Sequence, residues 1–130
     1  MAPTKYPTIA ELIEINKRVL GEIKVKKADQ HKLLSRGALE NVEKAVRDQE
    51  GDLYEKAVTM LTGLLRTHPF ASGNRRTAYL AAKGFLEMNG EKIEVEHDPE
   101  VLQGIRQEFY TRSEIRRWLE GHEIREFERA

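Results

Sequence analysis

Five residues that are suited to phosphate chemistry fall within a short stretch of this chain: His68, Gly73, Asn74, Arg75 and Arg76. The stretch lies between two segments with strongly helical residue patterns. A histidine on a loop that leads into a helix N-terminus can act as a general base beside an anion-binding site. The ordinary pKa of histidine, near ~6.5, suits it to take a proton from a hydroxyl nucleophile. The stretch therefore predicts phosphate transfer to a hydroxyl group.

The residues around the glycine have the chemistry of a phosphate cradle. Gly73 permits a tight turn and a close approach of the backbone to a ligand. Backbone N–H groups of residues 72–75 would lie at the start of the next helix, where the helix dipole favours an anion. The amide of Asn74 and the guanidinium groups of Arg75 and Arg76 would bind phosphate oxygens.

Composition narrows the class of protein. The chain has 130 residues, 39% hydrophobic and 34% charged, which predicts one globular domain over residues 1–130. Its 22 basic and 22 acidic residues give a formal net charge of zero, which argues against nucleic-acid binding. It has no cysteine, no apolar run long enough to cross a membrane and no apolar leader in residues 1–5. We therefore expect a cytoplasmic protein with no membrane partner.

Before the loop, the chain carries a helix signal and then a segment of a different kind. Thr8 and Glu11 have the spacing of a capping box and predict a helix over residues 8–20 that Gly21 closes. Residues 22–36 instead alternate apolar and basic side chains at first. This pattern is compatible with either a short hairpin or a flap-like loop.

Apolar spacing and capping residues predict the other elements. They are a helix around residues 39–48, a helix from Asp52 to about Leu65, a helix over 74–88 ended by Asn89 and Gly90, a short strand over 92–95, a helix from Asp98 and Pro99, and a final helix around Ile115 and Trp118 closed by Gly121. Phe70 is expected to anchor the loop in the core. His31, His97 and His122 lack metal-ligand spacing and are expected at the surface.

The loop resembles the signature of the Fic/Doc family, His-x-Phe-x-(Asp/Glu)-(Gly/Ala)-Asn-(Gly/Lys)-Arg. The positions that match in register are His68, Phe70, Gly73, Asn74 and Arg76. Residues 77–78 and 85–90, which follow the signature, resemble the Doc (death-on-curing) toxin-like branch.

The resemblance implies an all-α Fic fold and an activity that transfers part of a nucleotide to a protein hydroxyl. Family members usually transfer AMP from ATP, whereas the Doc toxin transfers a phosphoryl group to a translation elongation factor. By position, His68 would be the general base, Asn74 would organise phosphate or a metal site, and Arg76 would hold phosphate. Residues 24–36 would form the flap that aligns the target peptide. ATP or another nucleoside triphosphate, Mg²⁺, a Ser/Thr/Tyr protein substrate and a separate antitoxin are the implied ligands and partners.

Three residues depart from the family pattern. Ser72 stands where the family has the acid that holds Mg²⁺, and a hydroxyl is a poorer magnesium ligand than a carboxylate. Arg75 stands at the Gly/Lys position, with the charge of lysine on a bulkier, planar group. Tyr79 stands where the full Fic motif has a second arginine, which favours a Doc-type enzyme over an AMP transferase.

Other functions stay open at this point. Ser72 in place of the acid is compatible with a catalytically impaired member of the same fold that serves as a nucleotide- or protein-binding module. A nucleic-acid-binding helical domain is disfavoured by the zero net charge. The family's inhibitory motif, Ser/Thr-x-x-x-Glu-(Gly/Asn), is not matched, because Ser35 and Glu40 are one residue too far apart.

Overall fold

A computed structural model describes residues 3–22 and 31–129 of the chain. This part is all-α, with helices and no strands, as the sequence predicted. The helices are α1 (Ile9–Glu22), α2 (Arg36–Asp48), α3 (Leu53–Thr67), α4 (Asn74–Met88), α5 (Pro99–Arg106) and α6 (Arg112–Leu119). None of them is long and apolar enough to cross a membrane.

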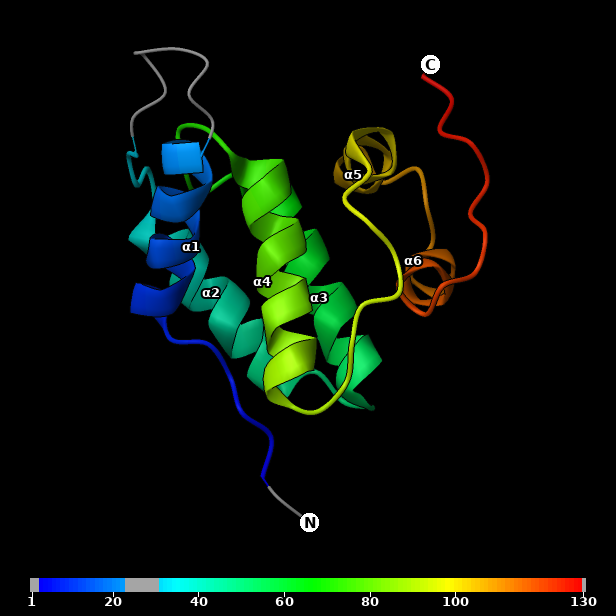
Figure 1. The fold of residues 1–130 in the computed structure, drawn as a ribbon, viewed down its shortest axis with the longest axis horizontal. Helices are drawn as coiled ribbons and strands as arrows, with labels where there is room; N and C mark the ends of the chain where they lie inside the picture. The colour runs from blue at the N-terminus through cyan, green and yellow to red at the C-terminus, as the bar shows by residue number, and fades with distance from the viewer. Residues whose placement is uncertain (1–2, 23–30, 130) are drawn as a thin grey trace.

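Helices α3 and α4 form the central pair of the domain (Figure 1). On one side, α1 packs against α4 and α2 packs against α3. On the other side, α5 and α6 both pack against α3. The start of α4 therefore lies between the α1 side and α5, and the loop that precedes it is enclosed from both directions.

Polar side chains cap the helix N-termini, with one exception. Thr8 and Glu11 exchange backbone-to-side-chain hydrogen bonds of 3.1 Å each, which confirms the predicted capping box of α1. The caps of the other helices are Ser35 for α2, Asp52 for α3, Asp98 for α5 and Thr111 for α6. The exception is α4, whose cap residue is Gly73 and whose N-terminus has no side-chain hydrogen bond. Its first N–H groups are thus left without the usual partner.

The centre of the core is built from small and large side chains of α3 and α4. Ala78, Ala81 and Ala82 are at most 1% exposed, which lets the α4 backbone approach its neighbours closely. Phe85 follows on the same helix and is fully buried. Trp118 of α6 is also buried. The predicted bounds of α4, residues 74–88, are confirmed.

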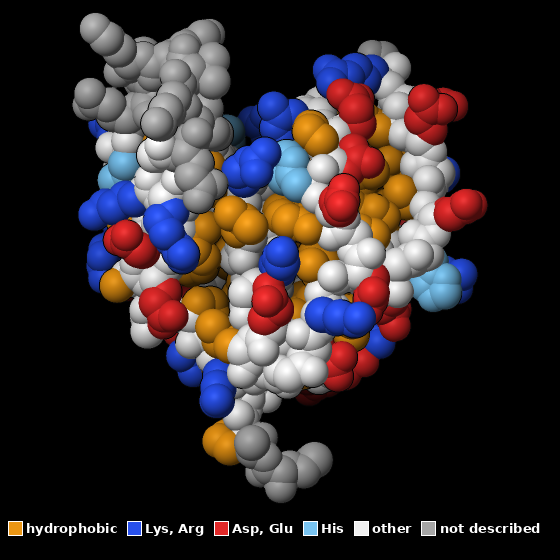
Figure 2. All heavy atoms as spheres, viewed as in Figure 1, with side chains coloured by type: hydrophobic (Ala, Val, Ile, Leu, Met, Phe, Trp, Pro, Cys, Tyr) orange, Lys and Arg blue, Asp and Glu red, His pale blue; other side chains and the backbone are white. Residues whose placement is uncertain are grey.

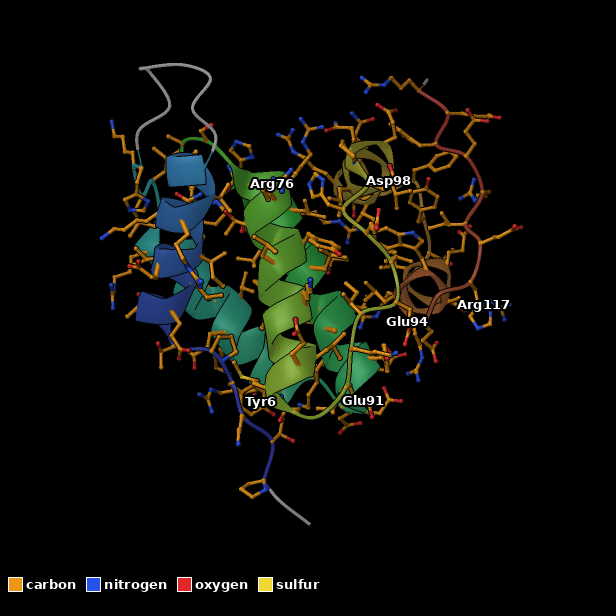
Figure 3. All side chains as sticks on the ribbon, viewed as in Figure 1. Tyr6, Arg76, Glu91, Glu94, Asp98 and Arg117 are labelled. Carbon is orange, nitrogen blue, oxygen red and sulfur yellow. The ribbon has the colours of Figure 1, made fainter. Side chains whose placement is uncertain are left out.

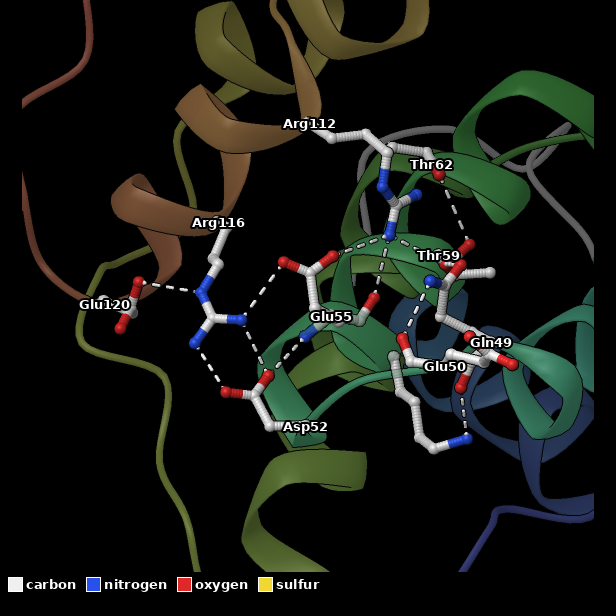
Figure 4. Close-up of polar contacts among 10 residues, drawn as sticks. Gln49, Glu50, Asp52, Glu55, Thr59, Thr62, Arg112, Arg116 and Glu120 are labelled. Atoms are coloured by element: carbon white, nitrogen blue, oxygen red, sulfur yellow. Dashed lines mark hydrogen bonds and ion pairs between the residues drawn. The ribbon is translucent and has the colours of Figure 1, made fainter.

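One arginine fastens α6 to the start of α3 (Figure 4). Arg116 forms ion pairs of 2.6 Å with Asp52, 3.1 Å with Glu55 and 3.2 Å with Glu120. These hydrogen bonds to Arg116 hold the pKa of Asp52 below its usual value. Because Asp52 also caps the N-terminus of α3, the same carboxylate starts α3 and binds Arg116 of α6.

The predicted strand over residues 92–95 is wrong. The segment is an extended connection between α4 and α5, and its backbone N–H at Glu94 donates to Leu119, at the end of α6, over 3.2 Å. Its alternating Ile93 and Val95 pack on the helical core, which explains the strand-like pattern. A strand needs a neighbouring strand for its ladder of hydrogen bonds, and the described residues offer none here.

The prediction for the first helix is corrected at its end. Gly21 does not end α1, which continues to Glu22. The predicted hairpin or flap over residues 22–36 falls mainly on residues 23–30, which lie outside the described residues. Residues 31–35, which the structure describes, lead into α2 without a regular strand and form one isolated bridge at Leu33.

Candidate functional site

The signature loop begins where α3 ends. His68 is the C-cap of α3 and has left-handed backbone angles, φ 51° and ψ 58°. A left-handed conformation is uncommon for a residue with a side chain and turns the chain sharply out of the helix. Pro69 and Phe70 then enter the protein interior, and Phe70 is fully buried. His68 itself stays exposed at the edge of the loop.

The segment before α2 supports the loop from outside. Leu33 and Phe70 form an antiparallel bridge. The N–H of Leu34 donates to the Pro69 carbonyl over 2.8 Å, and the N–H of Ala71 donates to the Lys32 carbonyl over 2.9 Å. The segment that resembles the family's flap is therefore joined at its C-terminal end to the candidate site by main-chain hydrogen bonds.

Asn74 closes the loop from inside. Its side chain is 7% exposed and bonds the main chain of Phe70 at both ends: the Phe70 N–H donates to Oδ1 over 3.1 Å, and Nδ2 donates to the Phe70 carbonyl over 2.7 Å. The sequence-based expectation gave this amide to a phosphate oxygen or a metal site. In the structure the amide binds the loop backbone, where it fixes the turn before α4.

Position 73 needs a glycine for two reasons: its backbone angles and the closeness of its neighbours. Its φ of +75° lies in the left-handed region. A Cβ at this position would lie 3.2 Å from side-chain atoms of Val19 and Leu20, and 3.3 Å from Nδ2 of Asn16. The glycine thus allows the loop to lie directly on α1, as well as permitting the turn that the sequence analysis inferred.

Asn16 is a site residue that the sequence analysis missed. It is fully buried, and its Nδ2 donates to the Ser72 carbonyl over 2.9 Å and to Oγ1 of Thr77 over 3.1 Å. Its Oδ1 lies 2.8 Å from Nδ1 of His31. The available signal was an asparagine one turn after Leu12 on an otherwise apolar helix face. A buried polar side chain needs partners, and here the partners are the site loop and α4.

His31 was expected at the surface, and the structure corrects this expectation. Its ring is partly buried and lies 5.9 Å, between centroids, from the ring of Phe70. His31 therefore contacts both Phe70 and Asn16, two residues that hold the loop in place. His122, by contrast, is exposed, as predicted.

A pocket of about 400 Å³ lies at the N-terminus of α4. Four segments line it: the end of α3, the signature loop with the first turn of α4, the connection before α5, and one face of α5. The lining residues are Leu65, His68, Ala71, Ser72, Gly73, Asn74, Arg75, Arg76, His97, Pro99, Gln103 and Arg106. Figure 2 shows Lys/Arg and His side chains close together near the top of α4, and Figure 3 labels Arg76 at the start of that helix and Asp98 at the start of α5. The predicted residues 72–76 and His68 are thus brought to one pocket.

The pocket is strongly cationic. Arg75, Arg76 and Arg106 line it, and no Asp or Glu lines it among the residues that the structure describes. Within residues 3–22 and 31–129, none of these three arginines has an ion-pair partner. The uncapped N-terminus of α4 adds its partial positive charge. An anion is the ligand that this arrangement favours.

Burial and the nearby arginines favour the neutral form of the two histidines in the pocket. Partial burial lowers the pKa of His68 below its ordinary value, and the nearby Arg106 lowers it further. Burial likewise lowers the pKa of His97, and Arg76 and Arg75 add to the effect. A neutral imidazole can accept a proton, so the lowered pKa favours the form of His68 that a general base needs.

His97 was expected at the surface and instead lines the pocket. Its ring packs edge-on against Tyr79, with centroids 5.5 Å apart. Its Nε2 is buried and has no hydrogen-bond partner among the described residues. Protonation of that nitrogen would bury a charged donor without an acceptor, which is a second reason for a neutral ring.

Tyr79 has a structural role at the position of the family's second arginine. Its side chain is buried, and its hydroxyl donates to the Val95 carbonyl over 2.6 Å. The bond ties the connection between α4 and α5 to α4. Tyr79 therefore holds in place the segment that carries His97, while the second positive charge of the full motif is missing here.

The donor groups of the pocket do not fit Mg²⁺. Magnesium prefers carboxylate oxygens, and the family's acid position holds Ser72. The neighbouring carboxylate, Asp98, accepts hydrogen bonds from the N–H groups of Glu100 and Val101 and does not line the pocket. Across the described part of the chain, no three His, Asp or Glu side chains cluster as metal ligands. A phosphate fits the same groups well, because they are donors and cations.

The fold and the pocket define an all-α domain with a cationic site at the N-terminus of its central helix. Residues 6–86, more than half of the chain, match the family model described as the Fic/DOC family, and the chain belongs to this family. Among curated proteins it is similar to Toxin Doc of Mycolicibacterium smegmatis (strain ATCC 700084 / mc(2)155), with 37% identity over 60 residues. That match covers 46% of this chain and 46% of the relative, so it spans about half the length of each.

Proposed function

We propose that this protein is a Doc-like, toxin-type transferase that moves a phosphoryl or nucleotidyl (AMP) group from a nucleoside triphosphate to a hydroxyl of a target protein. The observation that carries the proposal is one pocket that holds the His68 imidazole beside the uncapped N-terminus of α4. Family membership and the similarity to Toxin Doc support the same reaction class. ATP is the first triphosphate to test.

The roles follow from position. The N–H groups at the start of α4 would bind the phosphate that is attacked, and Arg75 and Arg76 would neutralise its charge. Gly73 lets the loop that carries these N–H groups lie directly on α1. Phe70 and Asn74 hold the loop that presents these groups.

The transfer step would use His68 as general base. Its imidazole takes the proton of the target hydroxyl, and the oxygen attacks a phosphorus of the triphosphate. A P–O bond forms to the target and the P–O bond to the leaving group breaks, releasing a nucleoside diphosphate (phosphoryl transfer) or pyrophosphate (nucleotidyl transfer). The proton then leaves His68 for solvent. A positioned base of this kind contributes about 10²–10⁴-fold to the rate.

We expect two protein partners. One is the substrate, which carries the Ser, Thr or Tyr hydroxyl, and a translation elongation factor is the first candidate. The other is a separate antitoxin, which the similarity to Toxin Doc suggests. The proposal includes neither a membrane nor a nucleic acid as partner, and the cytoplasm is the compartment in which such a target is found.

Intact-mass spectrometry tests this proposal. A bacterial or archaeal translation extract, with its elongation factor, is incubated with ATP, magnesium and the protein. The expected result is a protein in the extract that gains the mass of one phosphoryl or one AMP group. His68→Ala should abolish the gain, and His122→Ala, at an exposed histidine in the C-terminal tail, should leave it unchanged.

A second candidate function rests on Ser72 and Asn74. The acid position holds a hydroxyl, and the Asn74 amide is engaged with the loop backbone rather than directed to a ligand. Both features are compatible with a module that binds nucleotide or protein without transferring a group. Nucleotide binding with no mass gain in any protein of the extract would favour this candidate over the transferase.

A further inference from the structure

Helix α5 contributes a side of the pocket that the family signature does not include. Pro99, Gln103 and Arg106 line the pocket from this helix, and their spacing of four and three residues places them on one helix face. Arg106 lies in the last turn of α5. Arg106 lines the same pocket as His68, and its positive charge adds to the effect of burial in lowering the His68 pKa.

Arg106 is also short of a counter-charge. Its side chain is exposed, and no carboxylate pairs with it among the residues that the structure describes. Arg116, on α6, shows the contrast, because it forms ion pairs with three carboxylates. Like charges that are gathered around one pocket repel each other, and a bound polyanion removes that repulsion.

The charge that a bound triphosphate brings must be offset by some group in the pocket. In the family pattern, the acid at the position of Ser72 holds a metal ion that does so. Here the described residues that line the pocket include no carboxylate for the metal, and they include Arg106 on α5. A guanidinium binds two phosphate oxygens at once through its paired N–H donors.

We propose that Arg106 takes over the charge-neutralising role of the metal ion, so that this pocket binds a triphosphate without magnesium. The inference rests on the proposed function only in taking a nucleoside triphosphate as the ligand. Arg75 and Arg76 hold the phosphates at the start of α4, and Arg106 closes on them from α5. Arg106 is a phosphate-binding residue in this arrangement, and His68 remains the only base.

Isothermal titration calorimetry with ATP and with inorganic tripolyphosphate tests the inference. Each is titrated into the full chain in buffer with EDTA and again with magnesium in excess. Binding should be measurable with EDTA and should weaken several-fold with magnesium, because the metal neutralises phosphate charge that the arginines would otherwise meet. Binding that appears only when magnesium is present would overturn the inference.

Variants at Arg106 test whether this residue binds the triphosphate. Arg106→Gln should weaken metal-free binding of both ligands at least tenfold, and Arg106→Lys should lose less because it keeps the charge without the paired donors. Arg117→Gln is the matched control, since Arg117 is an exposed arginine on α6 that points away from the pocket (Figure 3). Thermal unfolding checks that each variant is folded. Equal affinity of wild type and Arg106→Gln would overturn the role of Arg106.

Ser72→Asp supplies the missing carboxylate and provides a reciprocal test. In EDTA the added negative charge should weaken triphosphate binding more than tenfold, and magnesium should now strengthen binding instead of weakening it. Binding of Ser72→Asp that is the same with and without magnesium would count against the inference.

The failures of the two proposals can be told apart. If metal-free binding depends on Arg106 but no protein in the extract gains mass, the transferase proposal fails and the inference stands. If transfer occurs but requires magnesium and is unchanged in Arg106→Gln, the inference fails and the transferase proposal stands.

Discussion

The side-chain amide of Asn16 donates a hydrogen bond of 2.9 Å to the main-chain oxygen of Ser72, which lies 56 positions later in the chain. This bond joins α1 to the loop at Ser72, the position where the family has an acidic residue. Asn16 is fully buried, so its amide depends on such partners in place of water. The loop that carries the pocket's backbone donors is therefore held by α1 as well as by α4.

Asn16→Ala is expected to destabilise the protein by about 1–3 kcal/mol, because it removes the bonds from the buried amide to the Ser72 carbonyl and the Thr77 hydroxyl. Urea unfolding measures the change. Asn41→Ala, at an exposed asparagine of α2, is the control and should stay within about 0.5 kcal/mol of wild type. Tripolyphosphate affinity should fall in Asn16→Ala only. Equal unfolding free energies of the two variants would contradict the assignment.

Two substitutions of His68 separate its chemistry from its backbone conformation. Both His68→Ala and His68→Gly remove the imidazole and should abolish transfer. His68→Gly should be more stable than His68→Ala by about 1 kcal/mol, because glycine adopts the left-handed angles of this position without strain. Thermal unfolding of the two variants measures the difference. A more stable alanine variant would show that the left-handed turn is absent in solution.

Stability is expected to rise with pH in the window below the ordinary histidine pKa. The pKa values of His68 and His97 are lowered in the folded protein, so the unfolded chain binds more protons there. The resulting loss of stability begins as the pH falls through about 6.5 and is complete below the folded pKa values. NMR titration of the imidazoles should give both values below 6.5. In a His68→Gln/His97→Gln double variant, the pH slope of the urea midpoint should be smaller; an unchanged slope would refute the prediction.

Gly104→Ala tests the packing that holds α5 in place. An added Cβ would lie 2.5 Å from Cε2 of Tyr110 and 3.1 Å from the ring of Phe127. We expect a loss of about 1–3 kcal/mol in unfolding free energy from this overpacking. Gly84→Ala is the matched control inside α4, where a Cβ meets no atom within 4 Å, and it should gain about 0.5–1 kcal/mol. Similar effects of the two substitutions would contradict the packing.

Local signals predicted most of the fold. The capping box at Thr8 and Glu11, the caps at Asp52 and Asp98, and the bounds of α4 all depend on residues close together in sequence. The strand predicted over residues 92–95 was wrong because alternation reports which side chains face the core. It does not report whether a partner strand is present.

For the site, the sequence alone determined the signature loop, its resemblance to the Fic/Doc family, and the missing acid at Ser72. These properties belong to a short run of neighbouring residues, so the order of residue types is enough to show them. Only the tertiary structure brought Asn16, His97 and Arg106 to that loop. They come from α1, from the connection after α4 and from α5, and helix packing alone determines which of their faces meet the pocket. The orientation of the Asn74 amide was decided in the same way, because a buried amide bonds whichever backbone groups the fold places beside it.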